Sequence, residues 1–218
     1  MYLLVAAAFL AAASPAAAAS LESLHRSGVR AQTGLEGSGF SRLADETERD
    51  RSLRLTRRSA DRAYRVASEL AMIERTAAEV QGELAALARA PQDQARQDRV
   101  EQRLKFMLDA LPIQTDALSW VAGVAIHIKY NLPPAGDAAY IAAVREMNSR
   151  VVEADEAGKK ATSSIAQADA AAQATAGLGE RAKWLSARLS AYGAEYAAYS
   201  AHVREDSAKL LAMLPGAG

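Results

Sequence analysis

Histidine is the residue with the widest chemical range in this chain, and only three are present: His25, His127 and His202. Imidazole nitrogens bind metal ions and haem iron, and in a helical bundle such ligands must project from facing helices at the same height. If the helices follow one another through short turns, His127 and His202 differ in height by about 18 Å at 1.5 Å rise per residue. His25 lies in a segment that is too rich in glycine for a stable helix. We therefore expect no metal site and no cofactor.

Two short motifs have part of a functional signature without the context that it requires. Glu22-x-x-His25 has the spacing of half a di-iron motif, which needs a second copy and two further glutamates. The sequence Gly-Lys-Lys-Ala-Thr at residues 158–162 lacks the upstream glycine of a phosphate-binding loop. Cysteine is absent, which excludes disulfides and thiolate chemistry. Since no nucleophile, base and orienting group occur together, we predict no catalytic residues and no enzymatic activity.

The sharpest surface feature is a set of five arginines spaced three or four residues apart. On a helix they fall within about 80° of one another, opposite an apolar arc. Guanidinium groups suit phosphate and carboxylate partners, so this face is a candidate site for anionic polymers, lipid head groups or an acidic protein surface. The alternative is a solvated face that is partly neutralised by Asp61 and Glu69. The five residues of this arginine face are Arg51, Arg54, Arg58, Arg62 and Arg65.

His202 and Asp206 form a second candidate, because side chains four residues apart on a helix can contact each other. The apolar spacing of the last helix places Asp206 on its core-facing seam, so the pair is a candidate pH-sensitive latch. The alternative is a frayed last turn in which Asp206 reaches water. On the same seam, Tyr192, Tyr196 and Tyr199 are expected to fill the core opposite an alanine-rich helix.

Long helices must position these candidates, because apolar residues recur at three- and four-residue intervals through most of the chain. From Tyr140 to Ala172 the spacing keeps a strict heptad, which predicts a seam for another helix. The fold class is all-α: an elongated antiparallel up-down-up-down four-helix bundle with coiled-coil-like seams, in which consecutive helices are neighbours. Pro112 is expected to kink the second helix or to divide it in two. The predicted helices span residues 43–90, 93–131, 137–176 and 179–213.

The first nineteen residues predict export. They carry no charged side chain, and an apolar run is followed by Pro15 and then by small residues up to Ala19. This pattern is typical of a cleaved secretory signal peptide, and the run is shorter than the ~20 residues that span a bilayer. Residues 20–40 contain four glycines and are expected to form a flexible arm. Residues 41–214 are expected to form one helical domain.

Three functions remain open. The first is an exported protein of the bacterial periplasm or cell exterior that acts as an adaptor or structural element, through contacts with another envelope protein or by self-association. The second is a binder of an anionic polymer or membrane surface through the arginine face. The third is a small-molecule sensor or carrier with a pocket near the Pro112 kink, lined by Leu111, Trp120 and the tyrosines. The formal net charge is zero, so no global field favours nucleic acid.

Overall fold

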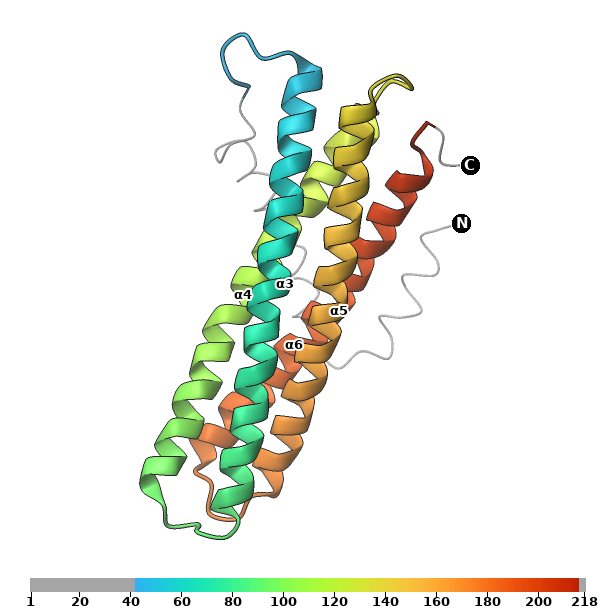
Figure 1. The fold of residues 1–218 in the computed structure, drawn as a ribbon. Helices are drawn as coiled ribbons and strands as arrows, with labels where there is room; N and C mark the ends of the chain where they lie inside the picture. The colour runs from blue at the N-terminus through green and yellow to red at the C-terminus, as the bar shows by residue number, and fades with distance from the viewer. Residues whose placement is uncertain (1–41, 216–218) are drawn as a thin grey trace, which may run out of the picture. The chain divides into compact units, whose positions relative to one another are not determined.

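A computed structural model describes residues 42–215, which contain four long helices (Figure 1). The predicted signal peptide and arm lie outside the described residues. The connections between α3 and α4 and between α5 and α6 lie together at one end, and the α4–α5 connection lies at the other (Figure 1). The helices are α3 (Glu48–Leu87), α4 (Gln94–Tyr130), α5 (Ala138–Ala174) and α6 (Glu180–Ala212).

Three of the four helices begin at a side chain that caps the first turn. Thr47, Asp93 and Asp137 each accept a hydrogen bond from the backbone N–H three residues later, as N-cap residues do. The prediction that the first helix begins near residue 43 is wrong, because Asp45 has a positive φ of 63° and Thr47 provides the cap. Asp137 is the expected cap of α5, and the structure confirms it.

Each helix packs against two others, and the pairs differ from those that chain order predicts. α3 packs against α4 and α5, and α6 packs against α4 and α5. The consecutive helices α4 and α5 are not an extensively packed pair. The expectation that every consecutive pair is adjacent is therefore wrong for α4 and α5. The loop between α4 and α5 places α5 beside α3 instead of beside α4 (Figure 1).

A two-pronged ion pair fixes the starts of α3 and α5. Arg49 donates from Nε to Asp137 Oδ2 at 2.6 Å and from Nη2 to Asp137 Oδ1 at 2.9 Å. The same Asp137 carboxylate accepts the Tyr140 backbone N–H at 3.1 Å. These hydrogen bonds, first the one from Arg49, hold the pKa of Asp137 below its ordinary value. One carboxylate thus caps α5 and joins it to α3.

The heptad seam of α5 is confirmed, since all ten of its predicted positions from Tyr140 to Ala172 are buried. α3 has a similar buried row, in which apolar residues spaced three or four apart run from Ala63 through Leu70 and Ala77 to Leu87. α4 runs unbroken from Gln94 to Tyr130 with Pro112 inside it, so the described residues form four helices and not five.

The core face of α6 agrees with the prediction at Tyr196, Val203 and Leu210, but the positions between them differ from it by one residue. Asp206 is exposed and the next residue, Ser207, is buried. Tyr196 is fully buried as expected, while Tyr192 and Tyr199 are only partly buried at the edge of the core. The buried row contains small residues at seven-residue spacing, which a search for large apolar side chains overlooks: Ser186, Gly193, Ser200 and Ser207.

Candidate functional site

The arginine face is largely engaged within the protein. Arg54 forms a forked pair with Glu46, with Nε–Oε1 at 2.7 Å and Nη2–Oε2 at 2.8 Å. The hydrogen bonds from Arg54 lower the pKa of Glu46 to about 2. Arg51 lies 3.5 Å from Glu48. Neither guanidinium is therefore presented to an external anion in the way that the sequence pattern predicts.

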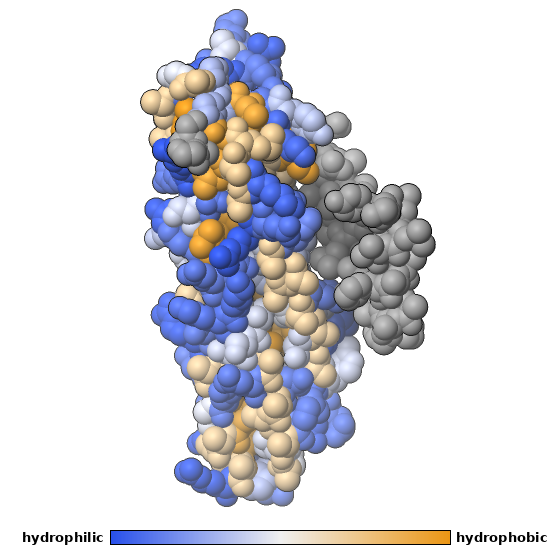
Figure 2. All heavy atoms as spheres, turned by 90° about the vertical axis from the view of Figure 1, so that its right-hand side faces the viewer, coloured by the Kyte–Doolittle hydropathy of each residue, from blue (hydrophilic) through white to orange (hydrophobic). Residues whose placement is uncertain are grey.

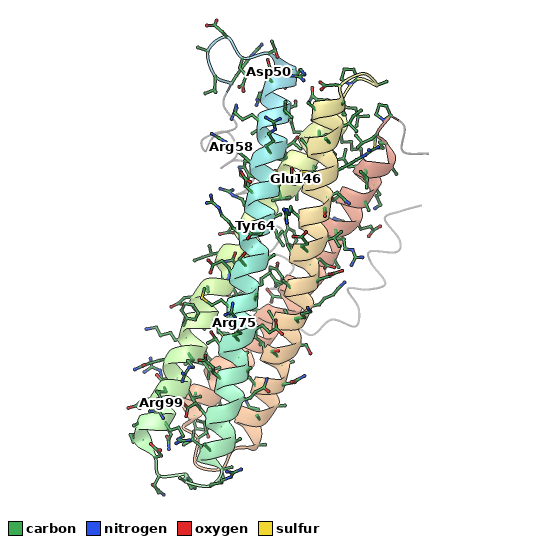
Figure 3. All side chains as sticks on the ribbon, in the orientation of Figure 1. Asp50, Arg58, Tyr64, Arg75, Arg99 and Glu146 are labelled. Carbon is green, nitrogen blue, oxygen red and sulfur yellow. The ribbon has the colours of Figure 1, made fainter. Side chains whose placement is uncertain are left out.

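Arg62 lies across an aromatic ring. Its guanidinium carbon is 4.5 Å from the centre of the Trp120 ring, a cation–π contact that bridges α3 and α4. Burial, and then the nearby Arg65, lower the pKa of Arg62. Arg58 and Arg65 are exposed, and Arg58 projects away from the bundle (Figure 3). Arg62 is exposed as well, but its guanidinium lies against the Trp120 ring. Arg58 and Arg65 are thus the two exposed arginines of the original five that have no ion pair or ring contact within residues 42–215.

The predicted His202–Asp206 pair is present, with His202 Nε2 and Asp206 Oδ2 at 3.3 Å. Both side chains are exposed, so Asp206 reaches water, as in the alternative interpretation, and does not face the core. Lys209 lies 3.5 Å from the same aspartate and 2.8 Å from Glu205. An exposed pair of this kind contributes little to stability because water and salt screen it. A latch closed by this pair would therefore be weak.

His127 is the histidine that the fold encloses. Its Nε2 lies 3.0 Å from Ser52 Oγ and 3.5 Å from Glu48 Oε1. A serine–histidine–acid relay places the serine and the acid on opposite ring nitrogens, whereas these two contacts share Nε2. Burial, and then the positive charge of Arg51, lower the pKa of His127, and Glu48 offsets part of this effect. The His127 imidazole thus joins α4 to α3, and its lowered pKa favours the neutral form.

A buried carboxylate on α5 was not predicted from the sequence. Asp155 is 1% exposed and accepts hydrogen bonds from Lys159 Nζ at 2.7 Å, Arg204 Nη1 at 2.8 Å and Ser200 Oγ at 3.2 Å. Burial opposes its ionisation, but these hydrogen bonds outweigh burial and lower the pKa of Asp155. The Lys159 pair could be found from its four-residue spacing. Arg204 could not, because it comes from another helix.

Aromatic and arginine side chains line the outer face of α6 over two turns. The Arg188 guanidinium carbon lies 5.2 Å from the ring centre of Trp184 and 5.7 Å from that of Tyr192. Trp184 is 55% exposed. The spacing of four residues between these positions was available in the sequence, but Trp184 lies outside the apolar seam. We call these three residues the α6 aromatic strip.

A groove of about 440 Å³ lies between the C-terminal ends of α4 and α6. Apolar atoms gather at this end of the described unit, where α6 ends (Figure 2). The pocket predicted near Pro112 is different: Leu111 is buried in the core, and Trp120 is buried and stacked on Arg62. The apolar lining residues of the observed groove are Ala122, Ala125, Ile126, Leu210, Ala212 and Met213.

Within residues 42–215, no group of three or more histidine, aspartate or glutamate side chains is placed to hold a metal ion. None of the helices in that range combines the length and apolar character needed to cross a membrane. Comparison with known proteins gives no match to a protein family, to a curated protein or to a solved structure. The function must therefore be argued from the chain's own surfaces.

Proposed function

We propose that this protein is an exported, non-enzymatic helical bundle that acts as an adaptor or structural element of the cell envelope through protein–protein contacts. The contact surface in this proposal is the α6 aromatic strip. The observation that carries it is the exposed ring of Trp184, 55% accessible and with Arg188 stacked on it. Tryptophan, tyrosine and arginine are the residues most enriched at the energetic centres of protein interfaces.

The side chains of the strip contact one another within the chain, without a partner. Arg188 contacts the rings of Trp184 and Tyr192, so the three side chains restrict one another on a rigid helix. A surface that is already ordered loses less conformational entropy on association. Arg188 also provides a donor for a partner's carboxylate at the edge of the aromatic rings. The partner that fits is a protein surface with an apolar patch beside an acidic side chain.

A photo-crosslinking amino acid at Ala191, an exposed position seven residues after Trp184 on the same face of α6, tests the contact in intact producing cells and leaves the strip itself unchanged. A discrete crosslinked species is expected, and Trp184→Ala should abolish it while thermal stability changes by less than about 0.5 kcal/mol, as for most exposed positions. A crosslinked species that persists in Trp184→Ala, or none at all, would contradict the proposal. The mass of the adduct separates a second copy of this chain from another envelope protein.

The chain offers a matched control for this experiment on a different face. Tyr64 on α3 is 54% exposed, and Arg150 stacks on it at 5.1 Å from the ring centre (Figure 3). A crosslinker at Ser68, an exposed position four residues after Tyr64, should give no discrete species, and Tyr64→Ala should leave the crosslinking from position 191 unchanged. Equal products from both positions would mean that crosslinking follows exposure and not a specific contact.

A second function, binding of anionic envelope components, is favoured by the exposed positions of Arg58 and Arg65. Two point charges on a helix face give weak, salt-sensitive attraction to an anionic surface. Retention of the chain on vesicles that contain phosphatidylglycerol should fall when both arginines are changed to glutamine. Retention at low salt that is equal for the variant and the parent chain would rule this function out.

The same proposal includes finer features of the fold. We infer an up-down-up-down chain order in which coiled-coil-like seams hold the helices, with α4 bent at Pro112. The missing proline N–H removes one helical hydrogen bond at that point and favours a bend. The strict heptads of α5 and the buried seven-residue row of α6 support the seams. A rigid rod of this kind suits a structural element that presents its contacts along its length.

A further inference from the structure

We propose that the groove between the ends of α4 and α6 binds a fatty carboxylate, a single anionic head group on an unbranched apolar chain. This site is separate from the α6 aromatic strip and does not depend on it. The groove has a volume of about 440 Å³, within the range of ~300–1,000 Å³ that is typical of small-molecule sites. Such sites also occur between the helices of bundles.

The walls of the groove are apolar and incompletely covered. Ala125 and Leu210 are buried at its base, while Ile126 is 50% exposed and Met213 is 44% exposed at its sides. The alanines on α4 leave a hollow that larger side chains would fill. Covering the exposed apolar area with a flexible chain removes that area from water and so stabilises the complex. Unbranched methylenes adapt to a narrow groove better than rings do.

The charges at the rim select the head group. Three ionisable residues line the groove: Lys129, Asp206 and Lys209. Lys209 is engaged by Glu205 at 2.8 Å and by Asp206 at 3.5 Å. Lys129 has no ion pair within residues 42–215, so its ammonium group is the rim charge that those residues leave unbalanced. A carboxylate placed beside the apolar walls would pair with it.

Isothermal titration calorimetry with sodium dodecanoate tests the site on the purified chain. We expect one saturable site per chain. Dodecyltrimethylammonium, which has the same tail and the opposite charge, should bind at least tenfold more weakly. Lys129→Gln should weaken dodecanoate binding about fivefold to tenfold, while Lys105→Gln, a matched exposed lysine on the same helix, should leave it unchanged. Ala122→Phe should weaken it at least tenfold by filling the groove.

Three outcomes would overturn the proposal. The first is the absence of saturable dodecanoate binding below 1 mM in a chain whose helical circular dichroism is intact. The second is an equal loss of affinity in Lys129→Gln and Lys105→Gln, which would show that binding follows overall charge. The third is a dimer in sedimentation velocity that dissociates in Ile126→Lys, because a second copy would then cover the groove. A loss of crosslinking from position 191 would not affect any of these outcomes.

Discussion

Gly158 on α5 lies directly against the ring of Tyr196 on α6, and this contact leaves no room for a side chain at position 158. A Cβ built on Gly158 would meet Tyr196 Cε1 at 2.6 Å, closer than two carbons can approach. Tyr196 is among the largest fully buried side chains of the protein. The glycine in the α5 seam therefore leaves room for this ring, and we call the Gly158–Tyr196 contact the socket.

Gly158→Ala should destabilise the protein by about 1–3 kcal/mol, because the ring or the helix must move to admit a methyl group. Gly193→Ala is the matched control on the facing helix: its Cβ would meet Thr162 and Ile165 at 3.6–3.7 Å, an ordinary contact. Since alanine favours helix by up to about 1 kcal/mol over glycine, Gly193→Ala should be neutral or stabilising. Urea unfolding measures both. A destabilisation of the same size in both variants would contradict the socket.

Asp155→Asn should lower the free energy of unfolding by about 1–3 kcal/mol, because Arg204 and Lys159 lose their shared counter-charge in the interface. Lys159→Gln should cost less than Asp155→Asn, since Arg204 and Ser200 still satisfy the carboxylate. Chemical denaturation at pH 7 compares the two. Equal losses would show that the carboxylate depends on Lys159 alone.

Acid stability should follow the same residue. The pKa of Asp155 is lowered in the folded protein, so its contribution is complete above the ordinary value of 3.8 and is lost as pH falls from there through the folded pKa. The Asp155→Asn variant should therefore lose less stability than the parent chain between pH 5 and pH 2. Thermal unfolding across that range measures the difference. Parallel curves for the two chains would contradict this assignment.

His127 should control stability nearer to neutral pH. Its pKa is lowered in the folded protein, so on acidification the unfolded chain takes up the proton first, and stability falls as pH drops below the ordinary value of 6.5. His127→Gln should remove this slope between pH 7 and pH 5. His202→Gln should leave it intact, because that imidazole lies in an exposed pair. If His202→Gln alone flattened the curve, the latch first inferred from the sequence would regain its support.

The proposed export predicts the N-terminal residue of the mature protein. If residues 1–19 are a signal peptide, the protein recovered from the periplasm or medium should begin at Ser20. N-terminal sequencing or intact mass measures this directly. Replacing Ala17 and Ala19 with leucine should block cleavage and leave the longer chain in the membrane fraction. A protein that is recovered from the cytoplasm with Met1 in place would rule out export.

Most of the helical architecture is predictable from the sequence, because apolar residues spaced three and four apart are buried together only when the chain is helical. The ten seam positions of α5 from Tyr140 onward are all buried, and the residues at each position are large or small but never charged. The register of α6 was harder to predict, because its row of serines and one glycine carries little hydrophobic signal. Tyr192 and Tyr199 are large and partly apolar, so the prediction placed them on the seam instead of their neighbours Gly193 and Ser200, which are the buried residues.

The candidate sites were less predictable, because they depend on contacts between helices. Five arginines at helical spacing indicate a charged face, yet Glu46 and Trp120 engage two of them from outside that pattern. The buried Asp155 has its partners on two helices, and the groove arises from the way the ends of α4 and α6 meet. Local spacing contains no information on which helices become neighbours when the connections permit more than one arrangement.

The Arg49–Asp137 pair has a consequence for the alignment of the bundle. One carboxylate both caps α5 and binds Arg49 on α3. The first turn of α5 is therefore held at a defined position along α3. A residue inserted between Asp137 and Tyr140 would shift Asp137 by one position relative to the buried seam. Either the cap at Asp137 or the burial of the seam could then be kept, but not both. Gly158 and the buried Asp155 lie farther along α5 and face Tyr196 and Arg204 of α6. Asp137 is thus the point at which the first turn of α5 and its contact with α3 are set together.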